Sequence, residues 1–171
     1  MFKSCFITLA FVLLILFTAR AQHQQLRTEI DHIARSSPAK VGVAIRLLET
    51  GDTLTYHNHR HYVMQSVFKF AIAIDVLHEV DKGRLKLEQP VHITKTDLPE
   101  TVSALREKYP EGNVDVPLKE LLNDMVTVSD NDACDILIKL LGGPVQVNRY
   151  IHSLGVNSIQ IKVNEAGMAL N

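Results

Sequence analysis

The chain has 171 residues, of which 46% are hydrophobic and 22% charged, and its formal net charge is −1. These values are ordinary for one folded unit and exclude a disordered, fibrous or low-complexity chain. The nearly neutral balance gives no basic footprint for nucleic acid or anionic membranes, so we expect neither as a partner.

The first 21 residues have a composition of their own. One early cation, Lys3, precedes an apolar run over residues 6–17, and Ala19-Arg20-Ala21 follows as a cleavage site. This layout is typical of a secretory signal peptide, and the run is short for a membrane span. The alternative is an uncleaved membrane anchor. We expect cleavage, export to the periplasm and no stable membrane association afterwards, with the mature chain a monomer.

Cleavage would leave 16 basic and 19 acidic residues, a formal charge of −3, and Cys134 as the single cysteine. One cysteine forms no internal disulfide, even in an oxidising compartment. His57, His59 and His61 alternate along the chain, but they have no nearby acid or cysteine to complete a ligand set. We therefore expect no metal site.

Hydrophobic spacing in the first third predicts a helix over residues 22–35 and then a β-hairpin. The helix is ended by Pro38, and alternating strands over residues 41–47 and 53–57 flank the turn at Thr50-Gly51-Asp52. No later strand pair is predicted. Because a lone hairpin is marginal in water, we expect further sheet strands beyond Asn171.

The chain from Ser66 onward has mainly helical periodicity. A helix is predicted over residues 66–82, closed by Gly83, and its centre is apolar on nearly every face, which is typical of a buried central helix. Three amphipathic stripes predict helices near residues 118–126, 133–141 and 147–154. The stretch 91–112 is rich in loop signals.

Ser66-Val67-Phe68-Lys69 puts a hydroxyl and an ammonium three residues apart, on one face of the predicted helix. Burial disfavours the ammonium and favours Lys69 as a base for a serine nucleophile, unless nearby acids hold it charged. The pattern alone is weak, because Ser37-Pro38-Ala39-Lys40 fits it too, before a strand and with a proline. The alternative is a helix N-cap with a snorkelling lysine.

Ser129-Asp130-Asn131 falls between two of the predicted amphipathic helices, where a short loop can project polar groups into a cleft. Ser129 can pass a proton to a leaving nitrogen, and Asn131 can donate to a substrate amide and to Lys69. Asp130 is expected to brace the loop through backbone hydrogen bonds. The alternative is a plain N-cap, with Ser129 or Asp130 as the cap.

Together, a Ser-x-x-Lys motif opening a buried helix and a Ser-Asp-Asn motif on a later loop resemble the penicillin-recognising serine enzymes. The wider sequence resembles class A serine β-lactamases, over residues 41–44, 49–52, 64–69 and 129–135. Lys108-Tyr109-Pro110 and residues 117–122 resemble the PER/VEB-like branch of that family. The resemblance extends over nearly all of residues 22–165.

The resemblance implies the two-domain β-lactamase/transpeptidase-like fold. That fold combines an α/β domain, built on a five-stranded antiparallel sheet, with an all-α domain inserted after the first hairpin; the active site lies between them. Residues 1–21 would be the signal peptide, residues 22–60 the first helix and hairpin of the α/β domain, and residues 61–171 the helical domain and the start of the Ω-loop. We expect this fold to be incomplete, with one hairpin representing the sheet.

Asn164-Glu165 resembles the start of the family's Ω-loop, which makes Glu165 the counterpart of the glutamate that activates the deacylating water. The alternative is a solvated loop glutamate. The chain departs from the family pattern after it: Met168 and Ala169 stand where Leu-Asn is usual, so Asn171 is given no role. No Lys-Thr-Gly or Lys-Ser-Gly triad, which helps bind the substrate carboxylate, occurs in the sequence.

The activity implied is β-lactam hydrolysis through a serine acyl-enzyme. Ser66 attacks the β-lactam carbonyl, and either Lys69 or Glu165 acting through a water takes its proton. Ser129 relays a proton to the ring nitrogen, and Asn131 binds the substrate. This mechanism implies no metal or organic cofactor. Because the third motif and further strands are absent, we expect the 171-residue chain alone to be inactive or nearly so.

Two other interpretations stay open. A penicillin-binding D,D-peptidase or a β-lactam sensor fragment would share Ser66, Lys69 and a Ser-x-Asn element but lack the deacylating glutamate. A non-catalytic remnant or interaction fragment is the alternative from another class, and the missing strands favour it for the isolated chain.

Overall fold

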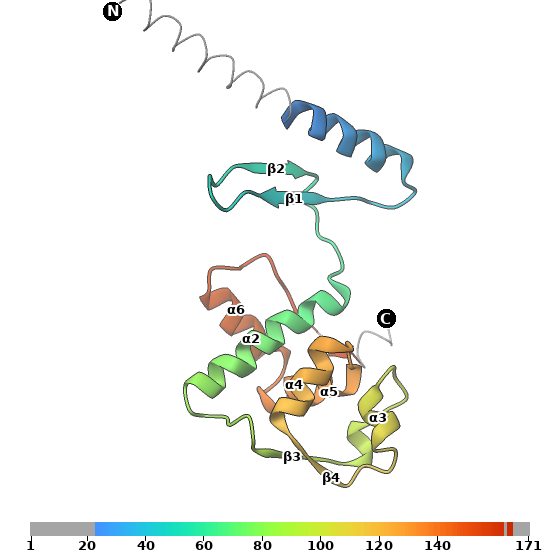
Figure 1. Ribbon diagram of the computed structural model, residues 1–171, viewed down its shortest axis with the longest axis vertical. Helices are drawn as coiled ribbons and strands as arrows, with labels where there is room; N and C mark the ends of the chain where they lie inside the picture. Colours follow the sequence, from blue (N-terminus) through green and yellow to red (C-terminus); the bar gives the residue numbers. More distant parts are fainter. Residues whose placement is uncertain (1–22, 163, 166–171) are drawn as a thin grey trace, which may run out of the picture. The chain divides into compact units, whose positions relative to one another are not determined.

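The computed structural model describes residues 23–162, 164 and 165, and they divide into two compact units (Figure 1). The first unit ends at Val63 and the second begins at Met64. The predicted signal peptide and the departures at Met168 and Ala169 lie outside the described residues. Within the described part of the chain, no helix is both long and apolar enough to cross a membrane.

The first unit consists of a helix and a hairpin, as the sequence predicts. Residues 23–36 are helical. Strands β1 (Val43–Arg46) and β2 (Thr53–Tyr56) pair antiparallel, with Val43 opposite Tyr56 and Arg46 opposite Thr53. Leu54 is the only buried hydrophobic side chain among the described residues of this unit, so its hydrophobic core is small.

The second unit contains the predicted helices. A 3₁₀ turn, η1 (Gln65–Val67), leads directly into α2 (Phe68–Asp81), and Gly83, at a positive φ of 71°, follows the end of that helix. Helices α4 (Leu118–Thr127), α5 (Asn131–Leu140) and α6 (Pro144–Ser153) match the three amphipathic stripes. Pro144 opens α6, where its fixed φ and missing N–H are tolerated.

The segment expected to be a loop holds a second strand pair, in a sheet separate from β1 and β2, so the prediction that no later strand pair occurs was wrong. Strands β3 (Pro90–Ile93) and β4 (Val114–Pro117) pair antiparallel. Between them lie a 3₁₀ turn, η2 (Lys95–Asp97), and the short helix α3 (Ala104–Lys108). Each strand has four residues and includes a proline, too short a run for alternation to stand out, and the partners are about twenty residues apart.

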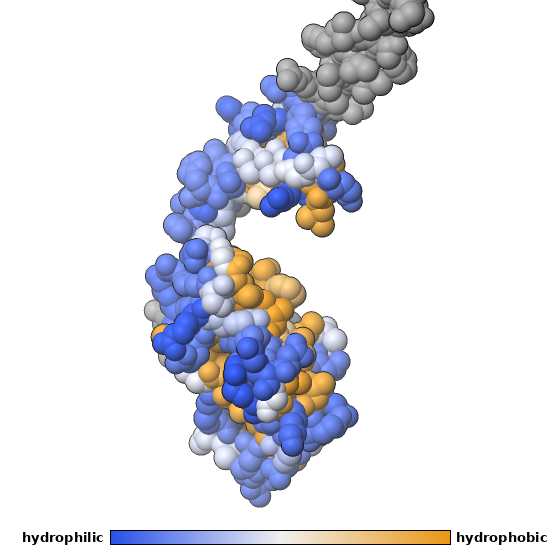
Figure 2. Space-filling model, turned by 90° about the vertical axis from the view of Figure 1, so that its left-hand side faces the viewer, coloured by the Kyte–Doolittle hydropathy of each residue, from blue (hydrophilic) through white to orange (hydrophobic). Residues whose placement is uncertain are grey.

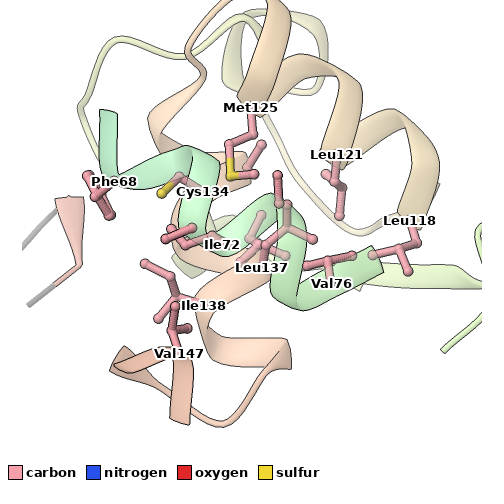
Figure 3. Close-up of a cluster of buried hydrophobic side chains, with 14 of the residues drawn as sticks. Phe68, Ile72, Val76, Leu118, Leu121, Met125, Cys134, Leu137, Ile138 and Val147 are labelled. Carbon is pink, nitrogen blue, oxygen red and sulfur yellow. The ribbon is translucent and has the colours of Figure 1, made fainter. Parts of the chain in front are cut away.

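The core of the second unit forms where α2, α4, α5 and α6 meet (Figure 3). Its side chains include Ile72 and Val76 from α2, and Met125, Leu137 and Val147 from the other helices, all at most 1% exposed. The composition of α2 predicts a helix that is buried on every side. One side of it is open instead, since Phe70 is 70% exposed. The core fixes α2 against the N-terminus of α5, and the predicted site residues other than Glu165 lie at or next to these two helix starts.

Candidate active site

Ser66 lies in the η1 turn and Lys69 in the first turn of α2. The N-caps of these two elements are Met64 and Val67, and neither cap makes a side-chain hydrogen bond. The Lys69 side chain is only 3% exposed. Ser66 is therefore not a helix cap and Lys69 does not snorkel to solvent, so the structural alternative considered for this motif is wrong.

Ser129 lies on the loop between α4 and α5, and its hydroxyl donates a hydrogen bond to Ser66 Oγ at 2.9 Å. Gln65, next to Ser66, and Ser129 both have positive φ angles, 48° and 59°. This left-handed region is strained for residues with a Cβ, and such strain tends to persist at functional sites, where the surrounding structure enforces it. The strained backbone brings the two hydroxyls together.

Lys69 connects the rest of the cluster. Its Nζ donates to the Ser129 carbonyl at 2.6 Å, to Asn131 Oδ1 at 2.6 Å and to Ser129 Oγ at 3.1 Å. Glu165 Oε1 lies 3.0 Å from the same Nζ, as an ion pair in which the Glu165 side chain is 14% exposed. One buried amine thus joins Ser129 and Asn131 of the Ser-Asp-Asn corner to Glu165.

Asn131 contacts Lys69 in the opposite sense to the expected one. We expected its amide to donate to Lys69, but an ammonium offers only donors, so Asn131 accepts through Oδ1. This orientation turns the amide nitrogen of Asn131 away from Lys69, where it can donate to another molecule.

Asp130 holds the Ser-Asp-Asn corner in place, and it is 1% exposed. Its carboxylate accepts from the Ala133 backbone N–H at 2.9 Å, which makes Asp130 the N-cap of α5. The same carboxylate accepts from the Leu105 N–H at 2.8 Å and from Ser103 Oγ at 2.9 Å. Asp130 therefore both caps α5 and braces the loop against α3, which joins the two roles that the sequence analysis set apart.

Asp135 is a site residue that the sequence analysis missed. Its Oδ1 accepts from the Glu165 backbone N–H at 2.7 Å, and its Oδ2 accepts from Asn164 Nδ2 at 2.8 Å. Asp135 lies four residues after Asn131 on α5, so both side chains are on one face of the helix. That spacing could have indicated that Asp135 lies near the site. Its contact with Glu165 could not be predicted, because the two residues are thirty positions apart in the sequence.

An open groove of about 820 Å³ runs from the cluster along α2 and α4. Ser66, Lys69 and Ser129 line it, together with apolar side chains that include Phe70 and Val126. The space-filling view shows exposed apolar surface on the second unit (Figure 2). A mostly apolar groove with a few convergent polar groups is typical of a small-molecule site.

A family model described as "Beta-lactamase enzyme family" matches residues 25–169. The chain belongs to this β-lactamase family. Among curated relatives, the β-lactamase VEB-1 of Pseudomonas aeruginosa is 41% identical over 88% of this chain and 50% of its own length. The extended-spectrum β-lactamase PER-1 of Pseudomonas aeruginosa is 37% identical over 89% of this chain and 50% of its own length.

A crystal structure of a β-lactamase from Chitinophaga pinensis matches the β-lactamase fold of this chain with a TM-score of 0.81 and 51% identity. The match covers 85% of this chain and 54% of that one, and structures of class A enzymes are among the other matches. The resemblance to class A enzymes of the PER/VEB-like branch is thereby confirmed. The chain spans about half the length of the curated relatives that it matches.

Two other acidic or nucleophilic groups lie near the site of this β-lactamase chain. Cys134 is fully buried, and burial raises the pKa of its thiol, so it is a packing residue and not a nucleophile. Burial likewise raises the pKa of Asp132, whose Oδ1 accepts from Thr101 Oγ1 at 2.6 Å. Within the described residues, no cluster of three or more potential ligands could hold a metal ion.

Proposed function

We propose that this chain supplies the serine nucleophile and its proton-transfer partners to a class A β-lactamase that hydrolyses β-lactam antibiotics. The observation that carries the proposal is the connected set Ser66, Ser129, Lys69 and Glu165, in which each member contacts the next within 3.1 Å. We also propose export to the periplasm, because the first 21 residues resemble a leader, and a monomeric mature chain.

Acylation begins with attack of Ser66 Oγ on the β-lactam carbonyl carbon. The contacts support a proton path from Ser66 through Ser129 to Lys69, once Lys69 has passed a proton to Glu165 at 3.0 Å. The alternative route runs from Ser66 to Glu165 through a water. When the carbon–nitrogen bond of the ring breaks, Ser129 donates a proton to the leaving nitrogen, and Ser66 becomes an ester.

Deacylation requires a water activated beside this ester, and Glu165 is the proposed base. Its backbone is tied to Asp135, which fixes the carboxylate at the lysine. This Glu165–Lys69 pair favours a hydrolase over a D,D-peptidase or a β-lactam sensor, which lack the deacylating glutamate. Asn131 is the proposed substrate-binding residue, through the amide nitrogen that Lys69 leaves unused.

The isolated 171-residue chain is a different case. It spans about half the length of its relatives, and the Ser66 groove has an exposed apolar wall. We propose that the purified chain alone gives no turnover of a chromogenic cephalosporin. Loss of one oxyanion-hole donor costs on the order of a hundredfold or more in rate, and several groups would be missing. Robust hydrolysis by the purified chain would contradict this part.

A chimaera tests the proposed mechanism. This chain replaces the matching half of VEB-1, so that the remaining half of VEB-1 completes the fold. The folded chimaera should hydrolyse a penicillin, and Ser66→Ala should reduce kcat by on the order of a thousandfold or more. Glu165→Gln should accumulate an acyl adduct, which peptide mass spectrometry should locate on Ser66.

The second Ser-x-x-Lys copy provides the matched control. Ser37→Ala removes a hydroxyl from the same motif outside the cluster, and it should leave the rate unchanged. A chimaera that circular dichroism shows to be folded, but whose adduct forms elsewhere or survives Ser66→Ala, would exclude Ser66 as the nucleophile. Rapid turnover by the Glu165→Gln variant would remove Glu165 from deacylation.

A further inference from the structure

Helix α2 carries a second buried charged side chain, Asp75, which takes no part in the candidate active site. It is 4% exposed, and no hydrogen bond or ion pair joins its carboxyl to another of the described residues. Only the charges of neighbouring side chains act on it through space, and they are those of Glu79, His78 and Arg84. A buried carboxyl without a partner is costly, so Asp75 requires a physical explanation.

Asp75 lines a pocket of about 490 Å³ that α2, α6 and the end of α5 enclose. The rings of His78 and Tyr150 stack in its wall, with centroids 4.4 Å apart and planes at 24°. Leu140 and Leu141 add apolar surface. None of its lining residues belongs to the groove at Ser66, so the two sites are separate.

The two arginines of this pocket are engaged elsewhere. Arg84 donates to both carboxylate oxygens of Glu79, with its Nη2 2.6 Å from Oε1. Arg149 Nη1 donates to Gln146 Oε1 at 2.6 Å. Neither guanidinium is hydrogen-bonded to Asp75, so the pocket combines an unpaired carboxyl with an aromatic and apolar wall.

We propose that this pocket binds a small organic cation, with a primary ammonium group against Asp75 and an aromatic or apolar body against the His78–Tyr150 ring pair. The ammonium supplies a direct ion-pair partner, which no described residue gives Asp75, and an aromatic face next to it adds a cation–π attraction. Burial is the largest cause that raises the pKa of Asp75 to about 6, and the Glu79 charge adds to it. The carboxyl is therefore ionised at neutral pH. This inference does not rest on the proposed β-lactam hydrolysis.

The test is a titration of the full chain with benzylamine at about pH 7.5, followed by proton–nitrogen NMR. We expect saturable shifts in α2 and α6 and binding at least about tenfold weaker in Asp75→Asn, because a buried charge pair is lost. Benzyl alcohol, which has the same shape without the charge, should not bind. Binding should weaken at about pH 5, where Asp75 is protonated.

Asp81→Asn is the matched control. It removes the same charge from an exposed residue at the end of α2, and it should leave the affinity for benzylamine unchanged. The proposal is overturned if benzylamine causes no saturable shifts, if Asp75→Asn binds it equally well, or if Asp81→Asn weakens binding as much as Asp75→Asn does. The titration does not measure β-lactamase activity, so the proposal of a cation site and the proposal of β-lactam hydrolysis can each fail without the other.

Discussion

The two buried charges of α2 have opposite surroundings. Lys69 has oxygen acceptors and a carboxylate around its Nζ, whereas Asp75 has no hydrogen-bond partner among the described residues. A satisfied buried charge fixes its neighbours in place, and an unsatisfied one destabilises the folded state. The same helix therefore contains a rigid site and a source of pH-dependent instability.

Asp75→Asn should stabilise the protein at high pH only. A carboxyl pKa raised from 3.8 to about 6 means that the folded state binds the proton more tightly than the unfolded state. The contribution of Asp75 to the free energy of unfolding is most favourable below about pH 4 and is lost as the pH rises through about 6. We expect Asp75→Asn to gain roughly 1–2 kcal/mol at about pH 8 and nothing at about pH 4, as measured by urea unfolding. An equal gain at both pH values would contradict this cause.

Five residues of the cluster could be predicted from sequence: Glu165 through the family resemblance, and the other four because each pair is close along the chain. Helical periodicity puts Ser66 and Lys69 on one face, and Ser129 and Asn131 lie where the interhelical loop meets α5. Asp135 could not be found in this way, because its role depends on a contact with Glu165 thirty residues away. Whether a charge is buried and unpaired likewise depends on packing, which local spacing does not specify.

At the scale of elements, the N-terminus of α5 connects the site to the rest of the second unit. Asp130 accepts hydrogen bonds from the first turn of α5 and from the start of α3, and Asn131 opens α5 with its side chain on Lys69. A change at this cap should therefore alter both the stability of the unit and the position of Ser129.

Asp130→Ala should lower the free energy of unfolding by roughly 2–4 kcal/mol, since it removes a helix cap and leaves the Leu105 N–H without its acceptor. Chemical denaturation followed by circular dichroism measures the loss. The control Asp81→Ala removes an exposed acid near the C-terminus of α2 and should cost less than about 0.5 kcal/mol. Equal losses in the two variants would mean that Asp130 is not a structural anchor.

The long helices were predictable because their apolar stripes recur over ten or more residues, whereas the β3–β4 pair was not. Val91 and Val116 face each other in that pair, but each strand has four residues and so contains only two repeats of the inward–outward alternation. A pairing between short, distant strands is decided by what packs against them, here the α2–α4–α5 core.

At the scale of the whole molecule, the two units differ in how much apolar surface they bury. Leu54 is the only buried hydrophobic side chain among the described residues up to Val63, while the second unit holds a core of about twenty such side chains. Stability within a chain follows this distribution, because opening a segment with few buried contacts costs little free energy.

Hydrogen exchange should therefore separate the units. Amides of β1 and β2 should exchange at least about a hundredfold faster than those of α2 and α5, because a hairpin with a small core is marginal. Mass spectrometry of peptic peptides from the full chain measures both rates in one sample. Similar protection in the hairpin and in α2 would mean that the hairpin gains stability from contacts beyond its own unit.

The burial of Cys134 bears on how the chain behaves in an oxidising medium. In the folded protein the thiol is fully buried and its pKa is raised, so it is shielded from oxidants and from other thiols. In a chain that has lost residues 1–21, which contain Cys5, only a molecule that has opened can become covalently linked to another copy. In an aged, air-exposed sample of that shortened chain, the fraction of disulfide-linked dimer should therefore increase with the number of molecules that have unfolded. Electrophoresis without a reducing agent measures this fraction.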